Sequence, residues 1–135
     1  VVYTDILGKF DGFDQYEYMD KEDILKTAAF VSLHIPYDKE VGPTITAREI
    51  EMMKDGAYLI NCARGGVVDE KALVEALNSG KLAGAAVDVF EVEPTANEDL
   101  VTCSNVSCTP HIGASTREAQ ARIGEEIVEI IKEYF

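Results

Sequence analysis

Short runs of apolar residues recur along the chain, and polar residues or glycines bound each of them. Their lengths of four to six residues fit β-strands better than helices. The five predicted strands are residues 1–4, 30–34, 57–61, 84–89 and 105–109. Because these runs are apolar almost throughout, they predict a parallel sheet that helices cover on both faces.

Segments with apolar positions at helical spacing lie between and after these runs. The predicted helices are residues 20–28, 46–54, 69–78 and 115–135. In the second of them, Thr46 is followed three positions later by Glu49, which predicts a capping box at the start of the helix. The last is a long amphipathic helix, with one apolar face made of Ile123, Ile127, Ile130, Ile131 and Tyr134.

The alternation of strands and helices predicts an α/β fold in a single domain-sized unit of 135 residues. The sequence contains no internal repeat, low-complexity tract or linker that would divide it. In open parallel sheets, ligands bind beyond the carboxyl ends of the strands. We therefore expect the residues that follow each strand to form the functional edge of the sheet.

Charge and cysteine usage narrow the classes of partner. The net charge of −13, from 25 acidic and 12 basic residues, disfavours nucleic acid and anionic membranes as partners. No run of about 18 apolar residues predicts a membrane-spanning helix. Cys62, Cys103 and Cys108 lack metal-ligand spacing, which predicts reduced thiols, no metal site and a cytoplasmic protein. Cys62 is expected to be a small packing residue.

Polar and ionisable residues follow all five predicted strands. Each could be an ordinary polar loop residue when taken alone, but their gathering at one edge of the sheet favours a binding site. They are Asp5, His34 with Ile35 and Pro36, Asn61 to Arg64, Asp88, and His111.

Arg64, Glu93 and His111 are the candidates for a reaction centre. The planar guanidinium of arginine matches a carboxylate with two parallel hydrogen bonds, and Gly65 and Gly66 are expected to leave room for a ligand. Imidazole is an acid–base near neutral pH, and the Glu93 carboxylate could orient the ring and favour its cationic form. Considered singly, a histidine like His111 is more often a helix-entry or core residue, and a glutamate like Glu93 is more often a solvated loop acid.

Asp5 has a different candidate role, at the end of the first predicted strand. An acidic residue at the end of the second strand of a dinucleotide-binding fold accepts hydrogen bonds from the adenosine ribose hydroxyls. It would repel a 2′-phosphate, so it favours NAD over NADP as cofactor. An aspartate after four apolar residues is weak support for this role by itself.

Four ordered segments resemble the D-isomer-specific 2-hydroxyacid dehydrogenases across essentially the whole chain. They are "SLHIP", "NCARGGVVDE", "GAAVDVFEVEP" and "CTPHIGASTREAQ". Their spacing also resembles the family pattern, with 29 positions from Arg64 to Glu93 and 18 from Glu93 to His111.

The resemblance implies an NAD-dependent oxidoreductase acting on a small 2-hydroxy or 2-oxo acid. It implies that Arg64 binds the substrate carboxylate and keto oxygen, His111 is the general acid–base, and Glu93 is its partner. It also implies that Asp5 binds ribose and Asp88 the nicotinamide carboxamide. The implied cofactor-binding residues are Asp5, Ile35, Cys62, Ala63, Arg64, Asp88, His111, Ile112, Gly113 and Ala114.

The sequences of these segments are most similar to those of members that oxidise 3-phospho-D-glycerate on the route to serine. Glyoxylate, hydroxypyruvate or D-lactate as substrate remains open. A non-catalytic, NAD-sensing protein like the related transcriptional corepressors also remains open. Family members associate through their cofactor domains, which implies a homodimer or homotetramer.

The sequence departs from the family pattern at one point. A family cofactor domain begins with a strand and a G-x-G-x-x-G turn that cradles the pyrophosphate, and no such motif occurs here. We therefore expect residues 1–135 to be a partial Rossmann-like NAD-binding domain, without its first βα unit and without the substrate domain. Such a piece is expected to bind NAD weakly and to be inactive alone.

Overall fold

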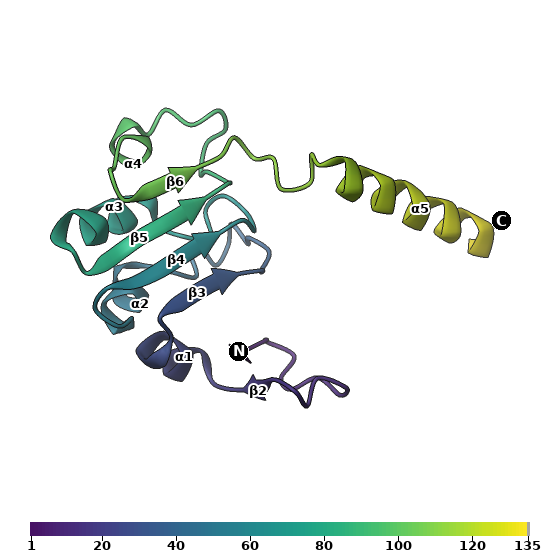
Figure 1. Ribbon diagram of the computed structural model, residues 1–135, viewed down its shortest axis with the longest axis horizontal. Coiled ribbons are helices and arrows are strands. Elements are labelled where there is room, and N and C mark those ends of the chain that lie inside the picture. Colours follow the sequence, from purple (N-terminus) through teal and green to yellow (C-terminus); the bar gives the residue numbers. More distant parts are fainter. Residues whose placement is uncertain (135) are drawn as a thin grey trace.

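A four-stranded parallel sheet forms the body of the protein, whose computed structural model describes residues 1–134. Its strands lie in the order β3, β4, β5, β6, and each pairs in parallel with the next. They are β3 (Phe30–Leu33), β4 (Ala57–Asn61), β5 (Leu82–Val87) and β6 (Val106–Cys108). The α/β prediction is confirmed, and Figure 1 shows that all four strands end at the same edge of the sheet.

The helices that precede and connect these strands build the core against one face of the sheet. They are α1 (Lys21–Thr27), which precedes β3, α2 (Ala47–Met52), α3 (Glu70–Ser79) and the short α4 (Glu98–Val101), which was not predicted. The prediction of cover on both faces is wrong: Leu59 is buried, whereas Phe30 and Tyr58 on the other face are 67% and 42% exposed. Strand order rises steadily along the sheet, and right-handed crossovers then place every connecting helix on the same face.

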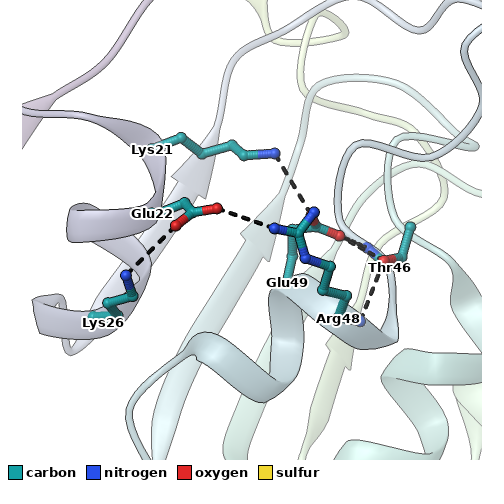
Figure 2. A network of polar contacts seen from close by, with 6 residues as sticks. All are labelled: Lys21, Glu22, Lys26, Thr46, Arg48 and Glu49. Atoms are coloured by element: carbon teal, nitrogen blue, oxygen red, sulfur yellow. Dashed lines mark hydrogen bonds and ion pairs between the residues drawn. The ribbon is translucent and has the colours of Figure 1, made fainter.

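Two ion pairs join α1 to α2, and a capping box begins α2 (Figure 2). Glu22 pairs with Arg48 at 3.1 Å, and Lys21 with Glu49 at 3.7 Å. The predicted capping box is confirmed, because Glu49 accepts the Thr46 N–H while Thr46 Oγ1 accepts the Arg48 N–H. Burial would raise the pKa of Glu49, but the bonds from Thr46 and the charge of Lys21 hold it below its ordinary value.

A second, two-stranded sheet lies outside the four-stranded one. It pairs β1 (Val2–Tyr3) in parallel with β2 (Glu17–Tyr18), and the rings of Tyr3 and Tyr18 meet edge to face at 5.6 Å. β1 occupies the centre of the predicted first strand, whereas β2 was not predicted. Figure 1 shows this small sheet apart from the β3–β6 sheet, beyond β3 and α1.

Helix α5 (Arg117–Tyr134) projects away from the body (Figure 1). The predicted amphipathic helix is therefore confirmed, with Phe135 outside the described residues. Its predicted apolar face packs on nothing among residues 1–134, and Ile123 and Tyr134 at its two ends are 42% and 75% exposed.

The described part of the chain holds neither a membrane-spanning helix nor a metal-binding cluster. No helix within residues 1–134 combines the length and apolar character needed to cross a membrane. Within the same residues, no cluster of three or more His, Cys, Asp or Glu side chains could hold a metal ion. The thiols of Cys62, Cys103 and Cys108 are free, and Cys62 is exposed, so its prediction as a packing residue is wrong.

Candidate active site at the carboxyl edge of the sheet

A buried asparagine shapes the turn that carries Arg64. Asn61, the last residue of β4, is 4% exposed and accepts the Ala63 N–H on Oδ1 at 3.2 Å. Its Nδ2 donates to the Arg64 carbonyl, also at 3.2 Å, so the side chain closes the turn from inside. Arg64 itself is exposed, and its Nη1 donates to the Ala63 carbonyl at 2.6 Å. Since a guanidinium has five N–H donors, this contact leaves most of them for a ligand.

The two glycines after Arg64 make room for the protein's own groups. A Cβ atom on Gly65 would lie 1.8 Å from the Phe90 carbonyl oxygen. At Gly66, whose φ is +81°, a Cβ would lie 2.7 Å from the ring of Tyr37. Phe90 and Tyr37 therefore fill the Cβ side of both glycines, while Gly65 still lines the pocket that holds Arg64.

A buried carboxylate holds the turn that carries His111. Asp88, 4% exposed, directly follows β5 and accepts the Ile112 and Gly113 N–H groups, both at 2.9 Å, and the Thr109 hydroxyl. Burial would raise the pKa of Asp88, but these three donors hold it below its ordinary value. They also hold His111 at a φ of 56°, a left-handed backbone that is uncommon outside glycine and costs free energy.

His111 and Glu93 form a direct pair beside this turn. Their atoms Nδ1 and Oε2 lie 2.7 Å apart, and the other Glu93 oxygen accepts the Phe90 N–H at 3.0 Å. The hydrogen bond from His111, followed by that from Phe90, lowers the pKa of Glu93. An ionised carboxylate can only accept, so Nδ1 carries the proton and Nε2 is the ring atom left to meet a ligand.

The three candidate catalytic residues line one pocket of about 450 Å³. Arg64 lies in this pocket with Glu93 and His111, as predicted from the sequence. The remaining lining residues are Pro36, Tyr37, Gly65, Phe90 and Glu91. A second pocket of about 600 Å³ shares Glu93 and His111, but its further lining is apolar or uncharged and lacks a cation. The smaller pocket is therefore the one that offers a guanidinium to an anionic ligand, beside the carboxylates of Glu91 and Glu93.

The remaining predicted cofactor residues differ in how close they lie to this pocket. Ile35 packs against the core at the end of β3, and Ala63 is buried beside the exposed Cys62. Ile112, Gly113 and Ala114 continue the His111 turn and are exposed. Asp5 lies in the separate β1–β2 region, where its Oδ1 accepts the Leu7 N–H at 2.8 Å.

Several residues that shape the site were not assigned a role from the sequence. Asn61 shapes the Arg64 turn through contacts two and three residues away. Thr109 and Tyr37 act through contacts with residues more than 20 positions away, which a linear pattern does not reveal. An asparagine as the last residue of an otherwise apolar strand was the one available signal.

The matching protein family is described as the D-isomer specific 2-hydroxyacid dehydrogenase, NAD binding domain, and it matches residues 1–113. The chain belongs to this family. Two of its relatives in this family show how close the likeness is. A hydroxypyruvate reductase of Thermotoga maritima is 49% identical over 118 residues, which are 85% of this chain and 39% of the relative. A D-3-phosphoglycerate dehydrogenase of Methanocaldococcus jannaschii is 48% identical over 113 residues, 84% of this chain and 22% of the relative.

Solved structures of the family share the fold. A glyoxylate reductase from Paecilomyes thermophila superposes with a TM-score of 0.87 at 32% identity, covering 97% of this chain and 40% of that one. A D-lactate dehydrogenase from Aquifex aeolicus, complexed with NAD and lactic acid, gives 0.81 at 36% identity, covering 98% and 45%. The chain therefore spans less than half the length of these dehydrogenases.

NAD is the cofactor of this family, and one carboxylate at the edge of the four-stranded sheet and one in the β1–β2 region fit part of it. Asp5 has a second carboxylate oxygen available for ribose hydroxyls, and Asp88 Oδ2 can accept a further hydrogen bond besides that from Gly113. Both are acceptors, as ribose hydroxyls and a carboxamide require. A glycine-rich cradle for the pyrophosphate is not among the 135 residues.

Proposed function

We propose that this chain carries the catalytic residues and the nicotinamide side of an NAD-dependent D-2-hydroxyacid dehydrogenase. The observation that carries the proposal is the convergence of Arg64, Glu93 and His111 on one pocket, with His111 Nδ1 bonded to Glu93 at 2.7 Å. A cation for a carboxylate and an oriented imidazole are what oxidation of a hydroxy acid requires.

Each residue has a defined task in this reaction. Arg64 binds the substrate carboxylate through its guanidinium fork and fixes the orientation of C2. His111 Nε2 takes the proton of the C2 hydroxyl, while Glu93 accepts the Nδ1–H and stabilises the imidazolium that forms. NAD, held on the Asp5 and Asp88 side, supplies the acceptor for the C2 hydride. Reduction of a 2-oxo acid runs the same proton transfer in reverse.

The preferred substrate is 3-phospho-D-glycerate, oxidised to 3-phosphohydroxypyruvate at the entry to serine biosynthesis. Relatives named as D-3-phosphoglycerate dehydrogenases support this choice. Hydroxypyruvate and glyoxylate reductases are equally similar, at 49% identity, and they support the reduction of a smaller 2-oxo acid as the second candidate.

A substrate panel on the longer enzyme that contains this chain tests the proposal. NADH formation with 3-phospho-D-glycerate, and NADH consumption with glyoxylate, hydroxypyruvate and pyruvate, should rank the candidates by kcat/KM. Turnover of a D-isomer in preference to its L-isomer is the expected result. NAD binding with no turnover of any 2-hydroxy acid would contradict the proposal and favour an NAD-sensing protein.

The proposal also covers the cellular location and the oligomeric state of the enzyme. We expect a cytoplasmic homodimer or homotetramer, as in family members that associate through their cofactor domains. Light scattering on the longer enzyme measures the mass directly, and a monomeric mass would contradict this part. Whether residues 1–135 alone turn over any substrate remains a prediction, with no turnover expected.

A further inference from the structure

Glu70 connects the turn that carries Arg64 to the loop that carries Glu93. It is the first residue of α3 and is 9% exposed, which is unusual for a carboxylate. Its Oε1 accepts the Glu91 N–H at 2.7 Å, and its Oε2 accepts Nδ2 of Asn97, also at 2.7 Å. In return Glu91 Oε1 accepts the Glu70 N–H at 3.2 Å. Both carboxylate oxygens are thus committed to the segment that follows β5.

The two anchored residues flank Glu93 on both sides. Glu91 lies two positions before it and Asn97 four positions after it, so the short segment between them is fixed at each end to α3. Glu93 itself is 37% exposed and points to His111 from this segment. Its direction therefore depends on where Glu70 holds the backbone.

The contacts around Glu70 also connect the Glu93 segment to the Arg64 turn. Helix α3 begins six residues after Arg64, and Gly65 packs so closely on the Phe90 carbonyl that a Cβ would lie 1.8 Å from it. The Arg64 turn and the Glu93 segment therefore meet twice, at Gly65 with Phe90 and at Glu70 with Glu91. We propose that Glu70 is a positioning residue, which sets the Glu93–His111 pair against Arg64 without touching the substrate. For the chemical role of that pair, the inference rests on the proposed function.

A purely structural carboxylate would stabilise α3 without affecting the state of the His111 ring. The difference is measurable, because the Glu93 contact holds the proton of neutral His111 on Nδ1, whereas an unconstrained imidazole favours Nε2. Long-range proton–nitrogen NMR spectra of the chain report this tautomer. Only His34 and His111 contribute, and His34→Gln assigns them.

Glu70→Gln removes one of the two hydrogen bonds that the side chain accepts, with little change in its shape. A carboxamide has one acceptor, so it cannot accept from both Glu91 and Asn97. We expect the Nδ1–H form of neutral His111 to be the major species in the wild type and the minor species in this variant. Adding Asn97→Asp restores an acceptor opposite the new amide, keeps the net charge and should return the wild-type spectrum. Glu75→Gln, at an exposed position of the same helix, is the matched control and should change nothing.

A Glu70→Gln spectrum that keeps Nδ1–H as the major species, with a lowered urea midpoint, would overturn the proposal. If Glu70→Gln does not fold, Glu91→Ala removes only the returning bond at an exposed side chain. It should give a smaller loss of the Nδ1–H form, and an unchanged tautomer would again overturn the proposal. None of these spectra depends on turnover, so they separate the positioning role from the proposed function.

Discussion

Helices α3 and α5 have similar amphipathic patterns but different surroundings. Helix α3 buries Leu73 and Leu77 against β5 and α2, and both side chains are less than a twentieth exposed. Helix α5 buries no residue, and Ile127 and Ile131 on its apolar face are about half exposed. Periodicity therefore specifies a helix and its apolar face, but it does not specify whether anything within the chain covers that face.

Truncating one apolar residue in each helix should give the largest contrast. Leu73→Ala leaves a cavity in the core and should lower the free energy of unfolding by about 3 kcal/mol. Ile127→Ala removes a half-exposed side chain and should change it by less than about 0.5 kcal/mol. Urea unfolding followed by circular dichroism measures both. Similar losses from the two variants would mean that α5 packs on the body in solution.

Two glycine substitutions test the same difference between the packed body and helix α5. Gly65→Ala drives a methyl group into the Phe90 carbonyl and should destabilise the protein by about 2 to 3 kcal/mol. Gly124→Ala in α5 meets no atom within 4 Å and should stabilise that helix by about 0.5 to 1 kcal/mol. Thermal unfolding of the body measures the loss from Gly65→Ala, and the helix signal in circular dichroism measures the gain in α5 from Gly124→Ala. A Gly65→Ala protein as stable as the wild type would show that the two active-site loops do not meet as described.

The two aspartates at strand ends should respond differently to the same change. Asp88→Asn leaves one of three donors without an acceptor and should cost about 1 to 2 kcal/mol. It should also shift the amide resonances of Ile112 and Gly113. Asp5→Asn keeps an oxygen for the Leu7 N–H, so it should change stability by less than about 0.5 kcal/mol. Equal effects would contradict the assignment of Asp88 as the residue that holds the His111 turn.

Lowering the pH should destabilise the active-site edge of the sheet, because the pKa values of Asp88 and Glu93 are lowered in the folded protein. Glu93 and Asp88 have folded-state pKa values below their ordinary values of 4.5 and 3.8. Their stabilisation is therefore present above the unfolded pKa and lost as the pH falls through the folded pKa. Glu93→Gln should be less stable than the wild type at neutral pH, and the difference should shrink as the pH falls below 4.5, the ordinary pKa value for Glu93. Urea midpoints at several pH values test this, and a gap that widens in acid would contradict it.

The sequence was informative where a contact follows from local spacing. The Thr46–Glu49 capping box lies within one helical turn, and strand β4 was predicted at its observed bounds because residues 57–60 form one apolar run that Asn61 ends. The convergence of Arg64, Glu93 and His111 followed from parallel strands ending at one edge and from the resemblance of the motifs. Each of these predictions needed only a short pattern or the general geometry of a parallel sheet.

Contacts between loops could not be predicted in the same way. The space beside Gly65 and Gly66 is taken by Phe90 and Tyr37, which lie more than 20 residues away in sequence. Cover on one face of the sheet follows from strand order, which local patterns do not contain. Strand β2 was missed because it has two residues and pairs only with β1.

An NAD titration of the chain, followed by the backbone amide resonances, tests the central claim most directly. We predict shifts at the carboxyl edge of the sheet, in residues 34–36, 61–65, 88–93 and 111–114, and at Asp5, the proposed ribose-binding residue, with unchanged resonances along α5. Binding at millimolar concentration is sufficient, because the prediction concerns where the shifts occur. Shifts confined to α5, or none at the sheet edge under saturating NAD, would contradict the claim that this edge is the cofactor and substrate site.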